Sequence, residues 1–409
     1  MRLAILFLLP ALLLAGCLGD GTQNAPDTGN AQNDGSQNSP SSDGPGYSAS
    51  PTSEAGSDED NPVRGAWLVA VRDMAVFNGK LYILGSYSSG AAAVYEYVDD
   101  KTMPKKILTL GYGEENTFSQ QDPRFKNKLL ELNSLAVHEN KLYAAGIAGL
   151  FRMKENGGWE YLNYPVSGGV GDVAILRLKA FDDGLYAGAA YYFSTAGSEN
   201  AIQTRRVLKF TGSGWQELPG ASGTGIGLGI HDLEKVGGTL YVAAESYAVY
   251  RYVTQGEGAP YFEDLTSDVQ GAENYAKLER FIRLGTDGTS LYACGEGAKV
   301  YKYSEPTWVL LKEVADDCKF FKQADGVLYF GVGGPWENPA LDNMGLFKIG
   351  ASGVEQVAAP LNEKQASSLA VHAVAKYNGQ LIAGTVWSDR GGALYKVENG
   401  KLDRIVFNN

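Results

Sequence analysis

The sequence is poor in cysteine, histidine and proline, with three, three and 15 of these residues among 409. It contains no Cys-x-x-Cys motif and no Cys/His cluster, which are the usual signs of a protein-bound metal. We therefore expect no metal and no other cofactor. It also lacks a basic patch, and this excludes nucleic acid as an expected partner.

Basic residues are absent from residues 18–63, which carry eight acidic residues. Leaving out these eight and Arg2 changes the formal net charge from −12 to −5 for residues 64–409. Residues 18–63 are rich in Gly, Ser, Asn, Asp, Pro and Gln and have almost no large apolar side chain. Because such a segment cannot bury enough apolar area to offset the entropy lost on ordering, we expect a disordered, flexible linker.

The chain begins with Arg2 and an apolar run, MRLAILFLLPALLLAGC. The run is shorter than the roughly 20 residues of a membrane-spanning helix and has the length of a secretory signal. Its end, Leu14-Ala15-Gly16-Cys17, resembles the lipobox of bacterial lipoproteins. That resemblance implies a signal peptide at residues 1–16, fatty acylation (palmitate or a related chain) of Cys17 and a membrane anchor. The alternative is an ordinary secretory signal with an incidental cysteine.

The residue after Cys17 bears on the destination of such a lipoprotein. In that family an Asp there retains the protein at the inner membrane of Gram-negative cells, and this chain has Leu18. The resemblance thus implies a lipid-anchored protein of the cell envelope, in the outer membrane of a Gram-negative host or on the surface of another host.

Assigning Cys17 to lipid leaves Cys294 and Cys318 as a pair. In an oxidising compartment an even pair favours a disulfide. The alternative is two buried free thiols, which are common core residues.

An apolar pair, mostly Leu-Tyr, recurs roughly every 50 residues. Its first residue is Leu81, Leu142, Leu185, Leu240, Leu291, Leu328 or Leu381. A turn rich in Asn-Gly or Asp-Gly precedes each pair, which is typical of a β-hairpin. Each repeat continues with a segment such as AVYEY or KVYKY and often a segment with Trp, so the pattern predicts four short antiparallel strands per repeat.

The predicted strands are apolar on both faces, as strands packed between two neighbouring sheets must be. The sequence therefore predicts an all-β fold over residues 64–409, a seven-bladed β-propeller of four-stranded antiparallel blades. Separate sandwich domains are the alternative, but the repeat is too short for them. Each repeat supplies four strands of its own, so the ring can close without a strand exchanged between the first and last repeats. The alternative is that a short outer strand near Arg64 contributes to the closure.

Signatures of WD-repeat, sialidase and quinone-binding propellers are absent. The repeated order of a turn, a Leu-Tyr pair, small residues and a Trp resembles that of the kelch-like and cell-surface propellers over the whole domain. This resemblance implies the fold and carries no function across.

Long segments connect the second and third strands and successive repeats, whereas the other turns are tight. We expect the long loops to lie on one side of the propeller and to form the functional face, as loops on rigid scaffolds often do. Exposed aromatics beside polar groups suit sugar or protein ligands. The candidate ligand-binding residues there are Tyr87, Tyr191, Trp336, Trp387, Asp389 and Arg390; the alternative is that the rings merely cover the ends of the blades.

A second set of candidates lies nine residues before the repeated Leu, in the first strand of each repeat. It comprises Arg72, His231 and His372, with Asn133 and Lys319 at the same position. We expect these side chains at the mouth of the central channel. His231 and His372 lie in distant repeats, which disfavours a shared metal, and a structural role for each His is the alternative.

Binding is the function that the sequence favours: a monomeric, lipid-anchored propeller that recognises an envelope protein or a glycan. An enzyme that cleaves extracellular polysaccharide is the alternative, but the sequence offers no clustered catalytic residues, so we name none. A scaffold in envelope assembly is a third possibility.

Overall fold

The structure, a computed structural model, describes most of the chain from residue 70 onward. The described residues are 70–86, 92–110, 131–147, 149–162, 173–193, 202–220, 223–224, 229–244, 248–254, 258–266, 280–296, 299–314, 318–333, 344–360, 369–387 and 392–407. They belong to a single compact unit, Pro51–Asn409. No helix in these residues is long and apolar enough to cross a membrane. The expected signal peptide, Cys17 and linker lie outside them.

Each repeat forms four strands that follow one another in space as they do in the sequence. The first strands, called inner strands below, are β1 (Ala70–Phe77), β5 (Leu132–His138), β9 (Val173–Phe181), β14 (Ile230–Val236), β18 (Arg280–Thr286), β22 (Cys318–Ala324) and β26 (Leu369–Tyr377). The second strands are β2 (Lys80–Ser86), β6 (Lys141–Gly146), β10 (Gly184–Phe193), β15 (Thr239–Ala244), β19 (Leu291–Glu296), β23 (Val327–Val332) and β27 (Gln380–Trp387).

The third and fourth strands complete each antiparallel meander. The third strands are β3 (Ala92–Tyr97), β7 (Gly149–Met153), β11 (Ile202–Phe210), β16 (Val249–Val253), β20 (Lys299–Ser304), β24 (Gly345–Gly350) and β28 (Leu394–Glu398). The fourth are β4 (Lys105–Leu110), β8 (Trp159–Leu162), β12 (Trp215–Glu217), β17 (Tyr261–Asp264), β21 (Thr307–Glu313), β25 (Gly353–Ala358) and β29 (Lys401–Arg404), and the short β13 (Gly223–Thr224) also pairs with β11.

The hairpin turns form as the sequence predicts. Asn78 and Gly79, between β1 and β2, have φ angles of 49° and 71°, and Asn378 and Gly379 repeat the pattern at 49° and 79°. Asn and Gly tolerate this left-handed region, and two such residues in a row suit the twist of a two-residue hairpin. The expected four-stranded antiparallel repeats are thereby confirmed.

The expectation of seven separate blades is wrong. Five repeats form separate sheets, with order β5-β6-β7-β8 and likewise for the repeats from β9 to β25. The first and last repeats instead share one eight-stranded sheet, in which β26 and β28 flank β27, and β1 also pairs with β27. The physical reason is the pairing of Ala70, the first residue of β1, with Val386 of β27, which continues the hydrogen-bonded sheet from the last repeat into the first.

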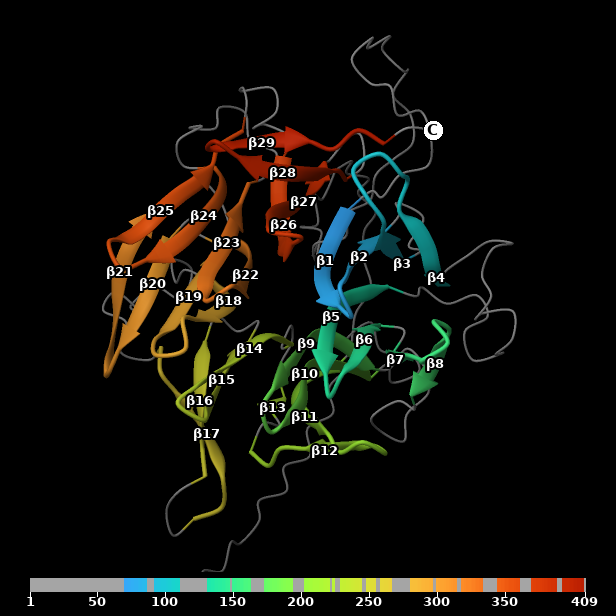
Figure 1. The fold of residues 1–409 in the computed structure, drawn as a ribbon. Coiled ribbons are helices and arrows are strands. Elements are labelled where there is room, and N and C mark those ends of the chain that lie inside the picture. Colours follow the sequence, from blue (N-terminus) through green and yellow to red (C-terminus); the bar gives the residue numbers. More distant parts are fainter. Residues whose placement is uncertain are drawn as a thin grey trace, which may run out of the picture. The chain divides into compact units, whose positions relative to one another are not determined.

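The repeats are arranged in a ring, as in a β-propeller (Figure 1). Hydrophobic clusters fill the space between successive repeats; one of them contains Leu84 of β2 and Phe151 of β7. Another contains Ile83 of β2 and Ile382 of β27, and so packs the last repeat on the first. The inner strands contact one another in the same circular order, including β26 with β1. Each repeat therefore buries both faces, as the apolar strands predict.

In three of the repeats a glycine stands three residues after the repeated Leu (Gly188, Gly331 and Gly384), and the next repeat approaches it closely. A Cβ atom on Gly331 would lie 2.0 Å from the carbonyl oxygen of Val371, and one on Gly384 would lie 2.3 Å from Cγ1 of Val71. Val371 and Val71 belong to the inner strand of the following repeat. The glycine thus lets the next inner strand pack directly against the second strand.

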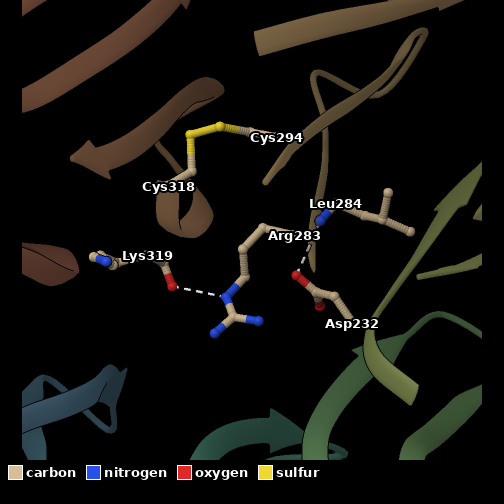
Figure 2. Close-up of a disulfide and its surroundings, with 6 residues drawn as sticks. All are labelled: Asp232, Arg283, Leu284, Cys294, Cys318 and Lys319. Atoms are coloured by element: carbon tan, nitrogen blue, oxygen red, sulfur yellow. Dashed lines mark hydrogen bonds between the residues drawn. A yellow bond between two sulfur atoms is a disulfide. The ribbon is translucent and has the colours of Figure 1, made fainter. Parts of the chain in front are cut away.

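In the fifth repeat a disulfide takes the place of this glycine contact. Cys294 stands three residues after Leu291, and Cys318 occupies the inner-strand position of Val371. The two cysteines form a disulfide between β19 and β22, with their Cα atoms 5.8 Å apart (Figure 2). They also belong to one hydrophobic cluster with Phe321 and Phe330. A covalent bond therefore joins the fifth and sixth repeats where other repeats use close packing.

Candidate binding site in the central channel

Every inner strand carries a β-bulge at the same repeat position. The register shifts lie between Val71 and Asp73, Leu132 and Ser134, Ile230 and Asp232, Phe281 and Arg283, Cys318 and Phe320, and Val371 and Ala373, and opposite Gly188 and Ala189 for β9. The extra residues are Arg72, Asn133, Leu176, His231, Ile282, Lys319 and His372. A bulge bends a strand and redirects its side chains, and bulges gather near functional sites. The bulges therefore form a level of extra residues around the channel.

The bulges lie near the side where the long loops begin. Ala70 at the start of β1 pairs with Ser86 at the end of β2, and β5 starts beside the end of β6 in the same way. The connections from second to third strands and from one repeat to the next join strand ends at this side. We call it the loop side, and the opposite side, with the tight hairpins, the turn side.

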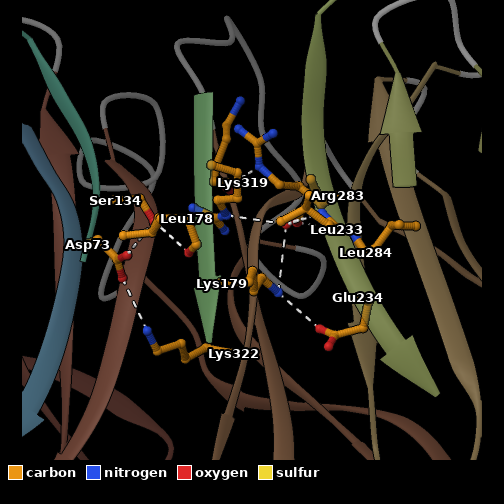
Figure 3. A network of polar contacts seen from close by, with 12 residues as sticks. Asp73, Ser134, Leu178, Lys179, Leu233, Glu234, Arg283, Leu284, Lys319 and Lys322 are labelled. Atoms are coloured by element: carbon orange, nitrogen blue, oxygen red, sulfur yellow. Dashed lines mark hydrogen bonds and ion pairs between the residues drawn. The ribbon is translucent and has the colours of Figure 1, made fainter. Parts of the chain in front are cut away.

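Asp73, directly after the bulge in β1, ties three repeats together (Figure 3). Its carboxylate accepts hydrogen bonds from the backbone NH of Met74 at 2.8 Å and of Leu135 at 2.9 Å. It also accepts from Oγ of Ser134 at 3.4 Å and pairs with Nζ of Lys322 at 3.3 Å. Charge-assisted bonds of this kind are among the strongest in proteins. Asp73 thus links the first, second and sixth repeats across the channel.

Asp232 has the same position in the fourth repeat and no exposed surface. Its carboxylate accepts from the backbone NH of Leu233 at 3.0 Å and from that of Leu284, in the next repeat, at 3.1 Å. Nε of Arg177 lies 3.3 Å from it and Nζ of Lys179 lies 3.6 Å from it. Asp232 therefore links the third, fourth and fifth repeats, as Asp73 links its own neighbours.

The cations around Asp232 keep it ionised. Burial alone would raise the pKa of Asp232, but Lys179, Arg177 and Arg283, with the NH of Leu284, outweigh burial and lower it. Burial likewise opposes the charge of Arg177 and Lys179, and the nearby carboxylates raise the pKa of both above their ordinary values. A buried charge is tolerated only with such compensation.

The channel contains a cavity of about 230 Å³. Every inner strand contributes to its wall. Its charged or titratable lining residues are Asp73, Arg177, Lys179, Glu234, Lys322 and His372. Lys179 pairs with Glu234 at 2.9 Å as well as with Asp232. The cavity therefore lies on the axis of the ring, has both charged and apolar side chains in its wall and is slightly smaller than the roughly 300 Å³ at which ordinary ligand pockets begin.

His372, the extra residue of the bulge in β26, lies among positive charges. Burial lowers its pKa well below the ordinary 6.5, and the cations of Arg72, Lys319, Arg283 and Arg177 lower it further. The imidazole is therefore neutral at neutral pH. These four cations belong to four different inner strands, and each of them disfavours a positive charge on the ring.

The disulfide holds two of these cations beside each other. Arg283 pairs with Cys294 in the ladder of β18 and β19, and Lys319 directly follows Cys318. Nε of Arg283 donates to the carbonyl oxygen of Lys319 at 2.8 Å, which joins β18 to β22 (Figure 2). One hydrogen bond and one covalent bond thus fix the spacing of the two basic residues.

The candidates predicted from the sequence divide into two groups. Arg72, His231 and His372 occupy the same bulge position on different inner strands, and Lys319 shares it. In the loop-side set, Tyr87, Trp336, Asp389 and Arg390 lie outside the described residues. Tyr191 and Trp387 belong to β10 and β27, but their side chains also lie outside what the structure describes. The predicted arc of aromatic side chains therefore stays a prediction.

Sequence reasoning missed the charged residues that follow the bulges. Asp73, Asp232, Arg177 and Arg283 all stand eight residues before the repeated Leu, and Lys179, Glu234 and Lys322 stand six before it. Charged residues at fixed positions in otherwise apolar strands are the signal that would have found them. Within the described residues, no group of three or more His, Cys, Asp or Glu residues is placed to hold a metal ion.

The sequence matches no protein family model and no curated protein. Its fold is similar to that of the extracellular domain of a putative one-component system from B. thetaiotaomicron, with a TM-score of 0.52 and 15% identity over 81% of this chain and 38% of that chain. Sqt1 of Saccharomyces cerevisiae gives a TM-score of 0.47 and 11% identity, with 84% and 87% covered. The chain thus spans well under two thirds of the bacterial protein. The first likeness supports the β-propeller fold and nothing beyond it.

Proposed function

We infer that this protein is a binding module of the cell envelope, a lipid-anchored β-propeller that recognises an envelope protein or a glycan at the loop side of its channel. The observation that carries the proposal is the channel on the axis of the ring, with a cavity of about 230 Å³ that begins at the bulge level near His372, extends toward the turn side and is lined by charged and apolar side chains. A rigid ring with a recess along its axis suits recognition, because the binding groups are held in place before the ligand arrives.

The state of the channel carboxylates favours binding over catalysis. Asp73, Asp232 and Glu234 each pair with a lysine, and Asp232 is fully buried. A general acid or base needs access to its substrate and a pKa near the working pH. The pKa of Asp232 is shifted in the opposite direction, downward. No observation therefore favours the polysaccharide-cleaving alternative over a binding role.

The proposed location rests on the sequence at the N-terminus. The end of the apolar run at Leu14-Ala15-Gly16-Cys17 supports lipidation of Cys17, and the linker of residues 18–63 supports a tether. A flexible chain of that length has an end-to-end distance of roughly 40 Å, enough to hold the propeller clear of the lipid surface. The disulfide agrees with an oxidising compartment outside the cytoplasm.

A pull-down from detergent-solubilised envelopes, with the protein as bait, tests the proposal. We expect a specific partner to be captured and Trp387→Ala to weaken its binding by about 30-fold, which corresponds to the loss of a central aromatic anchor. The control is Asn378→Ala at the turn side, which should leave the affinity unchanged. Full affinity in the Trp336→Ala/Trp387→Ala double variant would eliminate the loop-side aromatic surface.

A further inference from the structure

We propose that the cavity in the channel binds a small zwitterion, with the carboxylate of the ligand at Lys322 and its ammonium group at Glu234. The ligand class is an amino acid whose two charged groups end a short carbon chain. This inference goes beyond the proposed function, because it concerns a small free molecule and the turn side of the channel instead of an envelope partner at the loop side.

Two ion pairs face the cavity from opposite sides of the ring. Lys322 on β22 pairs with Asp73 on β1 at 3.3 Å, and Lys179 on β9 pairs with Glu234 on β14 at 2.9 Å (Figure 3). All four residues line the cavity. The inner strands follow one another around the ring in chain order, so β9 and β14 lie opposite β26, the strand between β22 and β1. The cavity therefore separates the two pairs.

The charge around the cavity is balanced. Three cations and two carboxylates line it, and a third carboxylate pairs with two of the cations. These residues are Arg177, Lys179, Lys322, Asp73 and Glu234 in the wall and Asp232 as the third carboxylate. A ligand with a net charge would upset this balance in a partly buried site, where an uncompensated charge is costly. A ligand that carries one charge of each sign keeps it.

Lys322 has hydrogen-bond donors left for a ligand. An ammonium group has three N–H donors, and among the described residues its partner is Asp73. The side chain of Lys322 is also 35% exposed, more than that of any other member of the two ion pairs. Its ammonium group can therefore bind a carboxylate in the cavity without leaving Asp73.

Glu234 has acceptor sites left on the opposite wall. One of its oxygens accepts from Nζ of Lys179 at 2.9 Å, and the other accepts from the backbone NH of Lys235 at 3.1 Å. An ionised carboxylate has about four acceptor sites, so about two stay open to an ammonium group. A zwitterion thus finds a donor at one wall and an acceptor at the other.

Much of the remaining wall is apolar and buried. It includes Leu135, Leu178, Phe320, Phe321 and Val374. Methylene groups gain free energy when they leave water for such a surface. The wall therefore favours a ligand with a carbon chain between its charged groups.

The cavity opens toward the turn side. Two of its lining residues, Val137 and Gln323, are exposed, and both stand five residues before the repeated Leu, near a hairpin turn. Directly after the bulges, Ser134, Phe320 and Ala373 are only 1%, 3% and 3% exposed. Exposure thus rises along the wall toward the hairpins, and a small molecule enters from that side.

Calorimetric titration of the purified full chain in a non-ionic detergent at pH 7.5 tests the inference. The probes are 4-aminobutyrate and 6-aminohexanoate, at constant ionic strength and up to about 10 mM. Butyrate and butylamine are the counterparts that each carry one of the two charges. We expect at least one zwitterion to bind, and each counterpart to bind at least about tenfold more weakly. Failure of both zwitterions overturns the inference, as does a counterpart that binds equally well.

Removal of the Lys322 charge locates the carboxylate end of the ligand. In Lys322→Met, Asp73 keeps its hydrogen bonds from the backbone NH groups of Met74 and Leu135, so we expect the fold to be retained. The affinity for the zwitterion should fall about tenfold. Lys348→Met, at an exposed ion pair with Glu355 on the outer strands of the same repeat, is the matched control and should leave it unchanged.

Removal of the Glu234 charge locates the ammonium end. In Glu234→Gln, Lys179 keeps Asp232 as a partner at 3.6 Å, and the side-chain oxygen can still accept from the NH of Lys235. We again expect a loss of about tenfold in affinity. Wild-type affinity in both Lys322→Met and Glu234→Gln overturns the inference.

Gln323→Trp serves if the charge variants do not fold. Because Gln323 is exposed and lines the cavity, a larger side chain there spares the core and fills the turn-side end of the cavity. We expect zwitterion binding to fall at least about tenfold. Gln216→Trp, at an exposed position of β12, is its control. Undiminished binding in Gln323→Trp contradicts a site at the turn side.

The titration and the pull-down fail independently, because the titration uses no envelope partner. Capture of a partner without zwitterion binding overturns only the zwitterion site. Zwitterion binding without capture of any envelope partner overturns only the proposed binding role.

Discussion

Asp73 and Asp232 perform one task in two repeats that are not neighbours. Each follows a bulge, accepts from the backbone NH of the next residue and accepts from the equivalent NH in the next repeat. Elsewhere in the ring Ser134 donates to the carbonyl oxygen of Leu178 at 3.1 Å and Arg283 donates to that of Lys319. One repeat position thus joins neighbouring inner strands with an acceptor in some repeats and a donor in others.

This position illustrates what the sequence could and could not predict at the scale of residues. Alignment of the repeats on the repeated Leu predicted one shared position for Arg72, His231 and His372, and the three residues do share one, the bulge position. The partners of Asp73 and Asp232 depend on which repeat follows which around the ring and on how closely the strands approach. Lys322 reaches Asp73 across β26, which has the small residues Ala373 and Ala375 nearby, and no local pattern contains that information.

His372 should make stability depend on pH. Its pKa in the folded protein lies well below 6.5, so the unfolded chain takes up a proton first as the pH falls. The stabilisation is therefore complete above about pH 6.5 and is lost below it, by at most about 1.4 kcal/mol per pH unit. Arg72, Lys319, Arg283 and Arg177 are the charges that oppose protonation.

Denaturant unfolding at pH 7.5 and pH 5.5 measures this effect. We expect His372→Gln to reduce the loss of unfolding free energy between the two pH values relative to the wild type. An equal pH dependence in wild type and His372→Gln would show that the pKa of His372 is the same in the folded and the unfolded chain and would contradict the account.

At the scale of elements, strands and hairpins were predictable because their signals are local. Asn-Gly turns and apolar pairs fixed the position of each hairpin, and the turns have the expected positive φ angles. The bulges, by contrast, form where an inner strand bends as it packs along the neighbouring inner strands. That packing is not a local property of the sequence. The joining of β1 to β27 rests on the contact of Ala70 with Val386, far apart in the sequence, so the sequence predicted seven separate blades.

The contact between the fifth and sixth repeats gives a prediction at this scale. Replacing the disulfide in Cys294→Ser/Cys318→Ser should lower the free energy of unfolding by about 2–4 kcal/mol, measured under oxidising conditions. Cys294→Gly/Cys318→Val copies the contact of Gly331 with Val371 and should recover part of the loss, because the valine refills the space between the strands. If the serine variant were as stable as the wild type, packing alone would hold the fifth and sixth repeats together.

At the scale of the whole molecule, charge is separated by region. Acidic residues dominate the linker of residues 18–63, whereas the inner strands hold more cations than carboxylates around the channel. A net charge far from zero favours solubility.

Lipidation belongs to this scale because it sets where the propeller works. Cys17→Ser should abolish labelling with a fatty-acid analogue and move the protein from the membrane to the soluble fraction, since the thiol that carries the lipid is gone. Cys318→Ser is the control and should keep both the label and the membrane association. Undiminished labelling of Cys17→Ser would refute the anchor.

Site-specific photo-crosslinking in intact envelopes tests the central claim, that the ligand binds at the loop side of the channel. A photoreactive amino acid is placed at position 387 at the end of β27, or at position 378 in the hairpin turn on the opposite side. The account predicts a crosslinked partner from position 387 and none from position 378. Crosslinking from position 378 alone, or equally from both positions, would contradict it.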